Sequence, residues 1–166
     1  MIRAGPQWRF ITKARDEKTM KAITLWQPWA TFIALKWKTI ETRTHSRFKS
    51  LVGQRIAIHA GRTVDRWGIW FDFLPPDLDI LKANNIETLI TISRGTIVCT
   101  ATIIAARWAP NVDFMEREEW DRKAMCEVAS KYCMFLEDIK PFNKKIPFRG
   151  SQGIFNVPDE LIKEKR

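Results

Sequence analysis

The sequence predicts a single α+β domain in which short strands build a small mixed β-barrel with flanking helices. Two observations predict the strands. Residues 38–43 switch from helical spacing to alternation, and residues 54–59 and 95–107 alternate apolar with polar side chains. The third observation is length, because 166 residues are enough for one hydrophobic core and too few to expect two.

The first elements lie within residues 24–43, which read TLWQPWATFIALKWKTIETR. A short apolar strand ends at Trp26. Pro28 then suits the first turn of a helix, because its ring presets φ and its missing N–H needs no partner there. Apolar residues at helical spacing predict a helix over residues 28–37, and the alternation that follows predicts a strand over residues 38–43.

Alternate side chains of a strand share a face, so we expect Thr39, Glu41 and Arg43 on one side and Ile40 in the core. Glu41 and Arg43 would stand roughly 7 Å apart. Lys38 lies at the junction between helix and strand. The sequence therefore predicts a small polar cluster beside the helix end, and the alternative is a solvated strand face whose charges serve only solubility.

The other elements follow from the same patterns. Helices are expected over residues 64–74, 77–83, 115–131 and 159–165, and strands over residues 21–26, 54–59, 95–108, 132–136 and 154–157. Residues 45–53 are expected to form a polar loop. The strand at 132–136 is expected to run into a loop that carries Lys144, Lys145 and Arg149.

The composition favours a polyanionic partner. Lys and Arg number 28 against 19 Asp and Glu, so the net charge is +9, and nucleic acid is the simplest partner for such a surface. Eight tryptophans offer flat faces on which unpaired bases stack, although most are expected in the core. Residues 1–19 are expected to be a flexible basic leader, and residues 20–166 the folded domain.

The cysteines and histidines predict neither a metal nor a disulfide. Cys99, Cys126 and Cys133 lie on separate predicted elements, and the chain has only two histidines, so no zinc-type spacing occurs. We expect no cofactor. Three thiols without a secretory signal indicate a reducing compartment, and no apolar run approaches the roughly 20 residues of a membrane span. The sequence predicts a cytoplasmic monomer with no membrane partner.

Three stretches carry a resemblance to a known family. The run WQPWA, the helix after it and the run KTIETR resemble the signature of the ASCH family, the domain named after activating signal cointegrator-1. Residues 47–60 and the glycine-containing turn at 149–156 follow in the family's order. The resemblance covers roughly residues 20–160. It implies a PUA-like β-barrel, a fold shared with RNA-modification readers, and a cleft bordered by the strand that ends at His59.

Charge and resemblance together predict a nucleic-acid-binding domain that holds single-stranded or locally unpaired RNA or DNA in a basic, aromatic-lined cleft. Phosphate contacts would supply affinity, whereas aromatic walls and a carboxylate–amide pair would discriminate between bases. The predicted binding residues are Trp26, Gln27, Trp29, Lys38, Glu41, Arg43, Arg47, Lys49, His59, Lys144, Lys145, Arg149 and Gln152.

Two other functions stay open. Some small ASCH proteins act as amidohydrolases on acetylated cytidine, and the resemblance implies Lys38 as the catalytic lysine. Glu41 stands where that mechanism has a threonine, so we expect little or no hydrolysis of acetylated cytidine. Glu41 could still act as a general base on water beside Lys38, in an amidohydrolase or a ribonuclease. The last alternative is an interaction module, as in a transcription coregulator.

Overall fold

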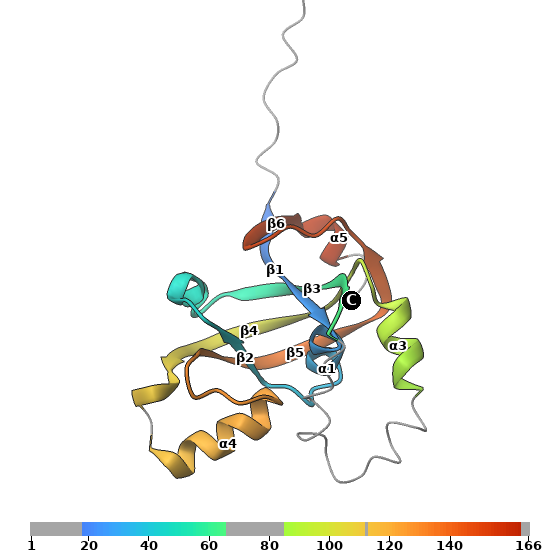
Figure 1. Cartoon of the computed structure of the whole chain (residues 1–166). Coiled ribbons are helices and arrows are strands. Elements are labelled where there is room, and N and C mark those ends of the chain that lie inside the picture. The colour runs from blue at the N-terminus through green and yellow to red at the C-terminus, as the bar shows by residue number, and fades with distance from the viewer. Residues whose placement is uncertain (1–17, 66–84, 112, 164–166) are drawn as a thin grey trace, which may run out of the picture.

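The computed structural model describes residues 18–65, 85–111 and 113–163, which form six strands, four α-helices and two short 3-10 helices (Figure 1). In chain order they are β1 (Thr19–Gln27), α1 (Trp29–Ala34), β2 (Ile40–Arg43), the 3-10 helix η1 (Ser46–Leu51), β3 (Arg55–Val64), α3 (Ile86–Ile92), β4 (Thr96–Trp108), the 3-10 helix η3 (Ala109–Asn111), α4 (Phe114–Ala124), β5 (Tyr132–Pro147), β6 (Ile154–Pro158) and α5 (Asp159–Lys163).

The six strands form one sheet in the order β2-β5-β4-β3-β1-β6. β1 and β3 run parallel, and the other neighbouring pairs of the described sheet are antiparallel. A parallel pair needs a crossover connection, which α1, β2 and η1 supply. The mixed α+β class is therefore confirmed. Over the described residues β2 and β6 form opposite edges, so the sheet is open and the barrel closure expected from the sequence is not confirmed.

Both faces of the central strands are covered. α1 and η1 pack on one face, where Ile33 and Leu51 join Ile58 in the main core. On the other face, Ile162 of α5 packs with Ala57 in a second core. Residues 56–61 of β3 are therefore all buried, which differs from the half-buried strand that the alternation predicted. A strand that is covered on both faces has no solvent-facing side, so burial need not alternate along it.

α1 is shorter than the predicted helix over residues 28–37. In its first turn the Thr31 N–H donates to the Gln27 side-chain oxygen at 3.1 Å. The helix ends at Ala34 because Lys36 adopts a left-handed backbone conformation, with φ of 64°, that a helix cannot contain. Trp37 still packs on Phe32, with ring centroids 5.6 Å apart. Its spacing in the sequence therefore reflects this buried contact, although Trp37 itself lies beyond the end of the helix.

The region from α4 to β5 also differs from the prediction. α4 begins at the cap residue Asp113, whose carboxylate accepts the Glu116 N–H at 3.0 Å, and it ends before Met125, which has φ of 54°. The predicted helix over residues 115–131 was therefore too long. β5 runs over sixteen residues, and a left-handed residue, Asp138, accompanies the shifts in its pairing with β4. The loop expected after residue 136 is thus strand as far as Pro147.

The predictions for β2, β3, β4, β6 and α5 are confirmed as to element type. α3 was not predicted. The predicted helices at 64–74 and 77–83 lie outside the described residues, except that Val64 is the last residue of β3. Residues 1–17 of the predicted leader also lie outside, and β1 begins at Thr19. In the part of the chain that the structure describes, no helix is long and apolar enough to cross a membrane.

Candidate nucleic-acid interface

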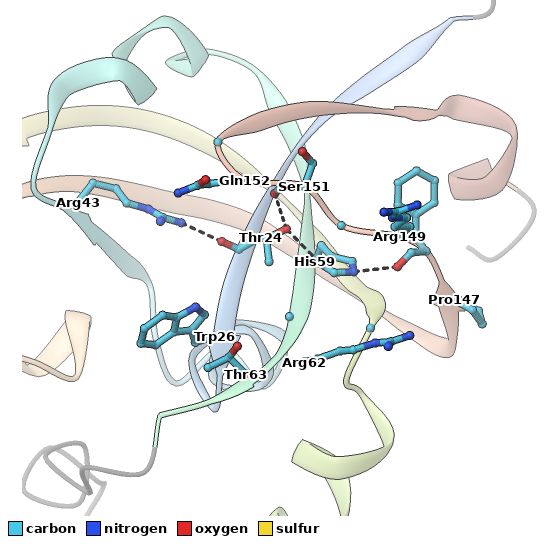
Figure 2. Close-up of a pocket in the computed structure, with 15 residues that line it drawn as sticks. Thr24, Trp26, Arg43, His59, Arg62, Thr63, Pro147, Arg149, Ser151 and Gln152 are labelled. Atoms are coloured by element: carbon cyan, nitrogen blue, oxygen red, sulfur yellow. Dashed lines mark hydrogen bonds between the residues drawn. The ribbon is translucent and has the colours of Figure 1, made fainter.

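A wide groove of about 1180 Å³ opens where β1 and β3 end against the segment that joins β5 to β6 (Figure 2). Three arginines line it: Arg43 of β2, Arg62 of β3 and Arg149 of the joining segment. None of the described residues on its wall is acidic. The residues that line this basic groove are Thr24, Trp26, Arg43, His59, Gly61, Arg62, Thr63, Gly95, Pro147, Phe148, Arg149, Gly150, Ser151, Gln152 and Gly153.

A bulge between β1 and β3 builds one wall of the basic groove. Leu25 pairs with Ala60 and Gln27 pairs with Val64, so residues 61–63 of β3 stand opposite Trp26 alone. Bulges of this kind redirect side chains. Residues 61–63 all line the groove, and Trp26 is left 57% exposed beside them. An aromatic face and an arginine therefore stand together at the groove.

Arg43 is held in place before any ligand arrives. Its Nη2 donates to the Thr24 carbonyl oxygen at 3.2 Å, and its guanidinium lies over the Phe48 ring, 4.9 Å from the centroid. Its Nε forms an ion pair with Glu41 Oε1 at 3.2 Å, although the geometry falls short of a hydrogen bond. A guanidinium carries more N–H donors than these contacts use. The side chain can therefore contact an anion in the groove without being rearranged.

His59 forms part of the groove wall and is 97% buried as a residue, with 3% exposed. Its Nε2 lies 3.0 Å from the Phe148 carbonyl oxygen, and its Nδ1 lies 3.2 Å from Thr24 Oγ1. Gly150 packs on the ring so closely that a Cβ at this position would collide with it. Burial lowers the pKa of His59 below its ordinary 6.5, and the hydrogen bond with the Phe148 backbone offsets part of this effect. The imidazole is therefore neutral at pH 7.

A second cavity, of about 350 Å³, contains the polar cluster predicted from the sequence. Lys38 and Glu41 are both buried there, and Lys38 Nζ lies 3.6 Å from Glu41 Oε2. Lys38 Nζ also donates to the Ala124 carbonyl oxygen at 2.5 Å and lies 5.2 Å from the centroid of a Trp29 ring. The residues that line this inner pocket are Trp29, Lys38, Glu41, Thr42, Asp65, Cys126, Glu127 and Lys131.

A small hollow of about 180 Å³ lies between the two cavities. It shares Trp26 and Arg43 with the basic groove, and Trp29 and Glu41 with the inner pocket. Glu41 is thus the carboxylate between the two cavities, paired with Lys38 on one side and Arg43 on the other. The arrangement offers cations for an anionic group at one end and hydrogen-bonding groups beside aromatic rings at the other.

The three cysteines have different surroundings. Cys99 and Cys133 are buried, and burial raises the pKa of each thiol to about 12. Cys126 is partly exposed and lines the inner pocket. Its Sγ lies 3.6 Å from Thr42 Oγ1 and accepts from Lys131 Nζ at 3.7 Å. Across the described ranges, no three side chains of His, Cys, Asp or Glu come together as a metal site would require.

The structure brings most of the predicted site residues into these cavities. Trp26, Arg43, His59, Arg149 and Gln152 line the basic groove, and Trp29, Lys38 and Glu41 line the inner pocket.

The other five predicted residues lie elsewhere. Gln27 is fully buried and donates to Thr31 Oγ1 and the Ile90 carbonyl oxygen, so it holds α1 in place. Lys49 lies over the Tyr132 ring, and Lys145 donates to the Phe142 carbonyl oxygen at 3.4 Å. These residues, with Arg47 and Lys144, line none of the three hollows.

Several residues of the site were not predicted. Arg62 was missed because the strand was expected to end at residue 59, whereas β3 continues to Val64 through the bulge. The run Arg62-Thr63-Val64, with two β-branched residues, is the signal that could have extended the strand. Cys126 and Lys131 were missed because they were expected inside a helix, and they lie in the segment after α4. The loss of regular structure there places both at the inner pocket.

Comparison with known proteins places the fold. Neither the protein-family models nor the curated protein sequences contain a match to this chain. Among solved structures, the crystal structure of ASCH from Zymomonas mobilis matches with a TM-score of 0.51 and 16% identity, over 87% of this chain and 91% of that one. A variant of that ASCH protein with one residue changed matches with a TM-score of 0.50 and 15% identity, over 87% and 94%. This chain therefore has the fold of ASCH proteins, as the sequence resemblance implied.

Proposed function

We propose that this protein binds single-stranded or locally unpaired nucleic acid, with phosphates in the basic groove and a base directed toward the inner pocket. One observation carries the proposal. Three arginines line a groove that has no acidic residue among its described lining, and an exposed tryptophan stands beside them. Polyanion backbones are bound by this kind of surface.

The arginines suit phosphate groups because a guanidinium presents paired N–H donors that match two phosphate oxygens. Arg43 is already oriented by Glu41, Thr24 and Phe48. Preorganised donors lose less conformational entropy when a ligand binds. Arg62 and Arg149 extend the cationic wall on the other side of His59 (Figure 2).

The aromatic side chains suit an unstacked base. Trp26 is more than half exposed at the point where the groove meets the small hollow, and Trp29 stands where that hollow meets the inner pocket. Stacking on such a ring contributes about 1–3 kcal/mol per base. Lys38 donates and Glu41 accepts hydrogen bonds, so together they can contact both kinds of group on a base edge. Paired bases in a duplex cannot offer those edges to a pocket.

The predicted basic residues that lie outside the cavities have a separate role in the proposed binding. Arg47, Lys49 and Lys144 are exposed, and Lys145 is partly so. They would contact phosphates that lie beyond the groove on a longer strand. Such contacts add affinity without reading sequence.

Titration of labelled oligonucleotides at several salt concentrations tests the proposal. Arg62→Gln should weaken binding to every sequence and should lower the slope of log affinity against log salt by about 0.7, the contribution of one phosphate on a single strand. Trp26→Ala should weaken binding about 5- to 150-fold, the equivalent of about 1–3 kcal/mol of stacking.

Arg122→Gln is the matched control. Arg122 is exposed on α4 and lines none of the three hollows, so its removal should leave the affinity nearly unchanged beyond the small effect of one distant charge. Equal losses in Arg62→Gln and Arg122→Gln would show that binding does not use the groove. A wild-type Kd weaker than about 0.1 mM at low salt would contradict the function itself.

A hydrolase is the second candidate, and one observation favours it. A buried lysine and a buried carboxylate, 3.6 Å apart, face a cavity of about 350 Å³. Glu41 would take a proton from water while the Lys38 ammonium stabilises the developing oxyanion. Incubation with single-stranded RNA and with acetylated cytidine, followed by product analysis, tests this role. Turnover that disappears in Lys38→Ala would support it, and intact substrates after long incubation would exclude it for these two substrates.

A further inference from the structure

Three polar contacts link His59 to the segment that joins β5 to β6, which borders the basic groove and is called the closing segment below. His59 Nε2 lies 3.0 Å from the Phe148 carbonyl oxygen, and His59 Nδ1 lies 3.2 Å from Thr24 Oγ1. Thr24 Oγ1 in turn donates to the Ser151 carbonyl oxygen at 3.0 Å. Figure 2 shows these contacts running from the closing segment through His59 and Thr24 and back to the same segment at Ser151.

The protonation state of His59 decides how many of these three contacts can be hydrogen bonds, because each hydrogen bond needs its own proton. A carbonyl oxygen only accepts, so His59 Nε2 must carry a hydrogen. In the neutral imidazole Nδ1 is then an acceptor, and the single Thr24 hydroxyl proton cannot serve both Nδ1 and the Ser151 carbonyl oxygen. In the imidazolium, Nδ1–H donates to Thr24 Oγ1, and Thr24 donates to Ser151. Only the protonated form makes all three contacts hydrogen bonds.

The surroundings of His59 oppose that protonation when the groove holds no ligand. The charged groups that share the groove with it are Arg43 from β2, Arg62 from β3 and Arg149 from the closing segment. The neighbouring strands contribute uncharged residues: Thr24 from β1, Ile97 as the pairing partner on β4 and Phe155 from β6. Burial lowers the pKa of the ring. No described carboxylate on the groove wall offsets the cost of a fourth cation.

We propose that His59 takes up a proton when a polyanion occupies the basic groove, so that nucleic-acid affinity rises as the pH falls. This inference rests on the proposed function. Bound phosphates supply the negative charge that the groove wall lacks, and the imidazolium completes the hydrogen bonds that hold the closing segment against the ring. By thermodynamic linkage, a ligand that prefers the protonated form raises the proton affinity of His59 by the same factor by which protonation raises the affinity for the ligand, and the pKa rises by the logarithm of that factor.

The pH dependence of the affinity is limited by the uptake of a single proton. Between the pKa of His59 in the free protein and its pKa in the complex, log affinity should rise by up to one unit, about tenfold, for each unit by which the pH falls. Outside that window the affinity should not depend on His59. The pKa of the free protein lies below 6.5, so the window begins on the acid side of neutrality.

The experiment is a titration of oligouridylate without terminal phosphates, between about pH 5 and pH 8 at constant ionic strength, where neither its bases nor its phosphodiesters titrate. Histidine ring NMR signals, recorded with and without the oligonucleotide, report the pKa of His59 directly. The chain has two histidines, so His45→Gln assigns the signals and serves as the control. His45 is exposed and stacks on Phe48, and the pH dependence should survive its removal.

Thr24→Val and Thr24→Ser separate the hydrogen-bond chain from charge alone. Valine keeps the shape and removes the oxygen that accepts from Nδ1–H, so the pKa of His59 should fall and the pH dependence should shrink. Serine keeps the hydroxyl and should keep the dependence. Wild-type binding that is constant with pH, or a His59 pKa that does not rise with ligand, would overturn the inference and leave the proposed function standing. Absence of binding at every pH would overturn both.

Discussion

Replacing Glu41 by Gln should destabilise the fold strongly, because this carboxylate neutralises two cations at once. Lys38 Nζ lies 3.6 Å and Arg43 Nε 3.2 Å from its oxygens. The Lys38 side chain is only 2% exposed, whereas that of Arg43 is 25% exposed. An amide of nearly the same shape removes the charge, so Lys38 would remain buried without the carboxylate that pairs with it. Removing one partner of a buried pair costs about 3–5 kcal/mol.

The low end of that range applies to Glu41→Gln. Lys38 keeps its hydrogen bond to the Ala124 carbonyl oxygen, and solvent partly screens Arg43. We expect a loss of about 3 kcal/mol. For a urea m-value of about 2 kcal/mol/M, the unfolding midpoint should fall by about 1.5 M while the slope stays constant. Urea unfolding followed by tryptophan fluorescence measures this shift.

Two variants make the Glu41 prediction refutable. Lys38→Met combined with Glu41→Gln removes the buried charge together with its partner, so the double variant should lose less stability than the sum of the single changes, by about 1–3 kcal/mol. Glu119→Gln breaks the exposed pair with Lys123, whose side chains are half exposed, and should leave the midpoint unchanged. Losses of stability that simply add in the double variant, or a Glu41→Gln midpoint equal to that of Glu119→Gln, would contradict the prediction. Either result would show that the buried Lys38–Glu41 pair contributes no more stability than an exposed pair.

Three further predictions concern the groove wall and the thiols. Gly150→Ala should lower stability by about 1–3 kcal/mol in urea unfolding, because the added Cβ meets the His59 ring and lies 2.8 Å from Thr24 Oγ1; unchanged stability would contradict the close packing. The free energy of unfolding should fall as the pH falls from 6.5 toward the lower pKa of folded His59, because the unfolded chain binds the proton more tightly. His59→Gln should flatten this dependence of unfolding free energy on pH. An equal dependence in that variant would show that His59 does not cause it. At about pH 8, iodoacetamide should alkylate Cys126 well before the other two thiols, whose pKa values are raised to about 12, and peptide mapping that finds the opposite order would refute the described burial.

The sequence predicted the element types where periodicity and packing agree. The switch at residue 38 led to β2, and its face assignment brought Glu41 and Arg43 together. The helix ends were less predictable, because left-handed residues such as Lys36 and Met125 end α1 and α4, and neither is a glycine that would mark the stop. Barrel closure was expected from the short alternating strands and from the family resemblance, but alternation within a strand does not determine whether the two edges of a sheet meet.

The candidate site was predicted in part for similar reasons. The polar cluster at residues 38–43 is contiguous in sequence, so strand parity was enough to assemble it. The basic groove instead combines β3 with a segment almost ninety residues later, as the His59–Phe148 contact at a separation of 89 residues shows. Arg62 joins it only through the β3 bulge, which no single-strand pattern specifies. The leader, the monomeric state and the cytoplasmic location stay predictions.

A crystal structure of the protein with a bound oligouridylate would show where the nucleic acid lies. We expect phosphate oxygens within hydrogen-bond distance of the Arg43, Arg62 or Arg149 guanidinium groups and a uracil ring against Trp26. An oligonucleotide bound along another face, with the basic groove empty, would contradict this expectation.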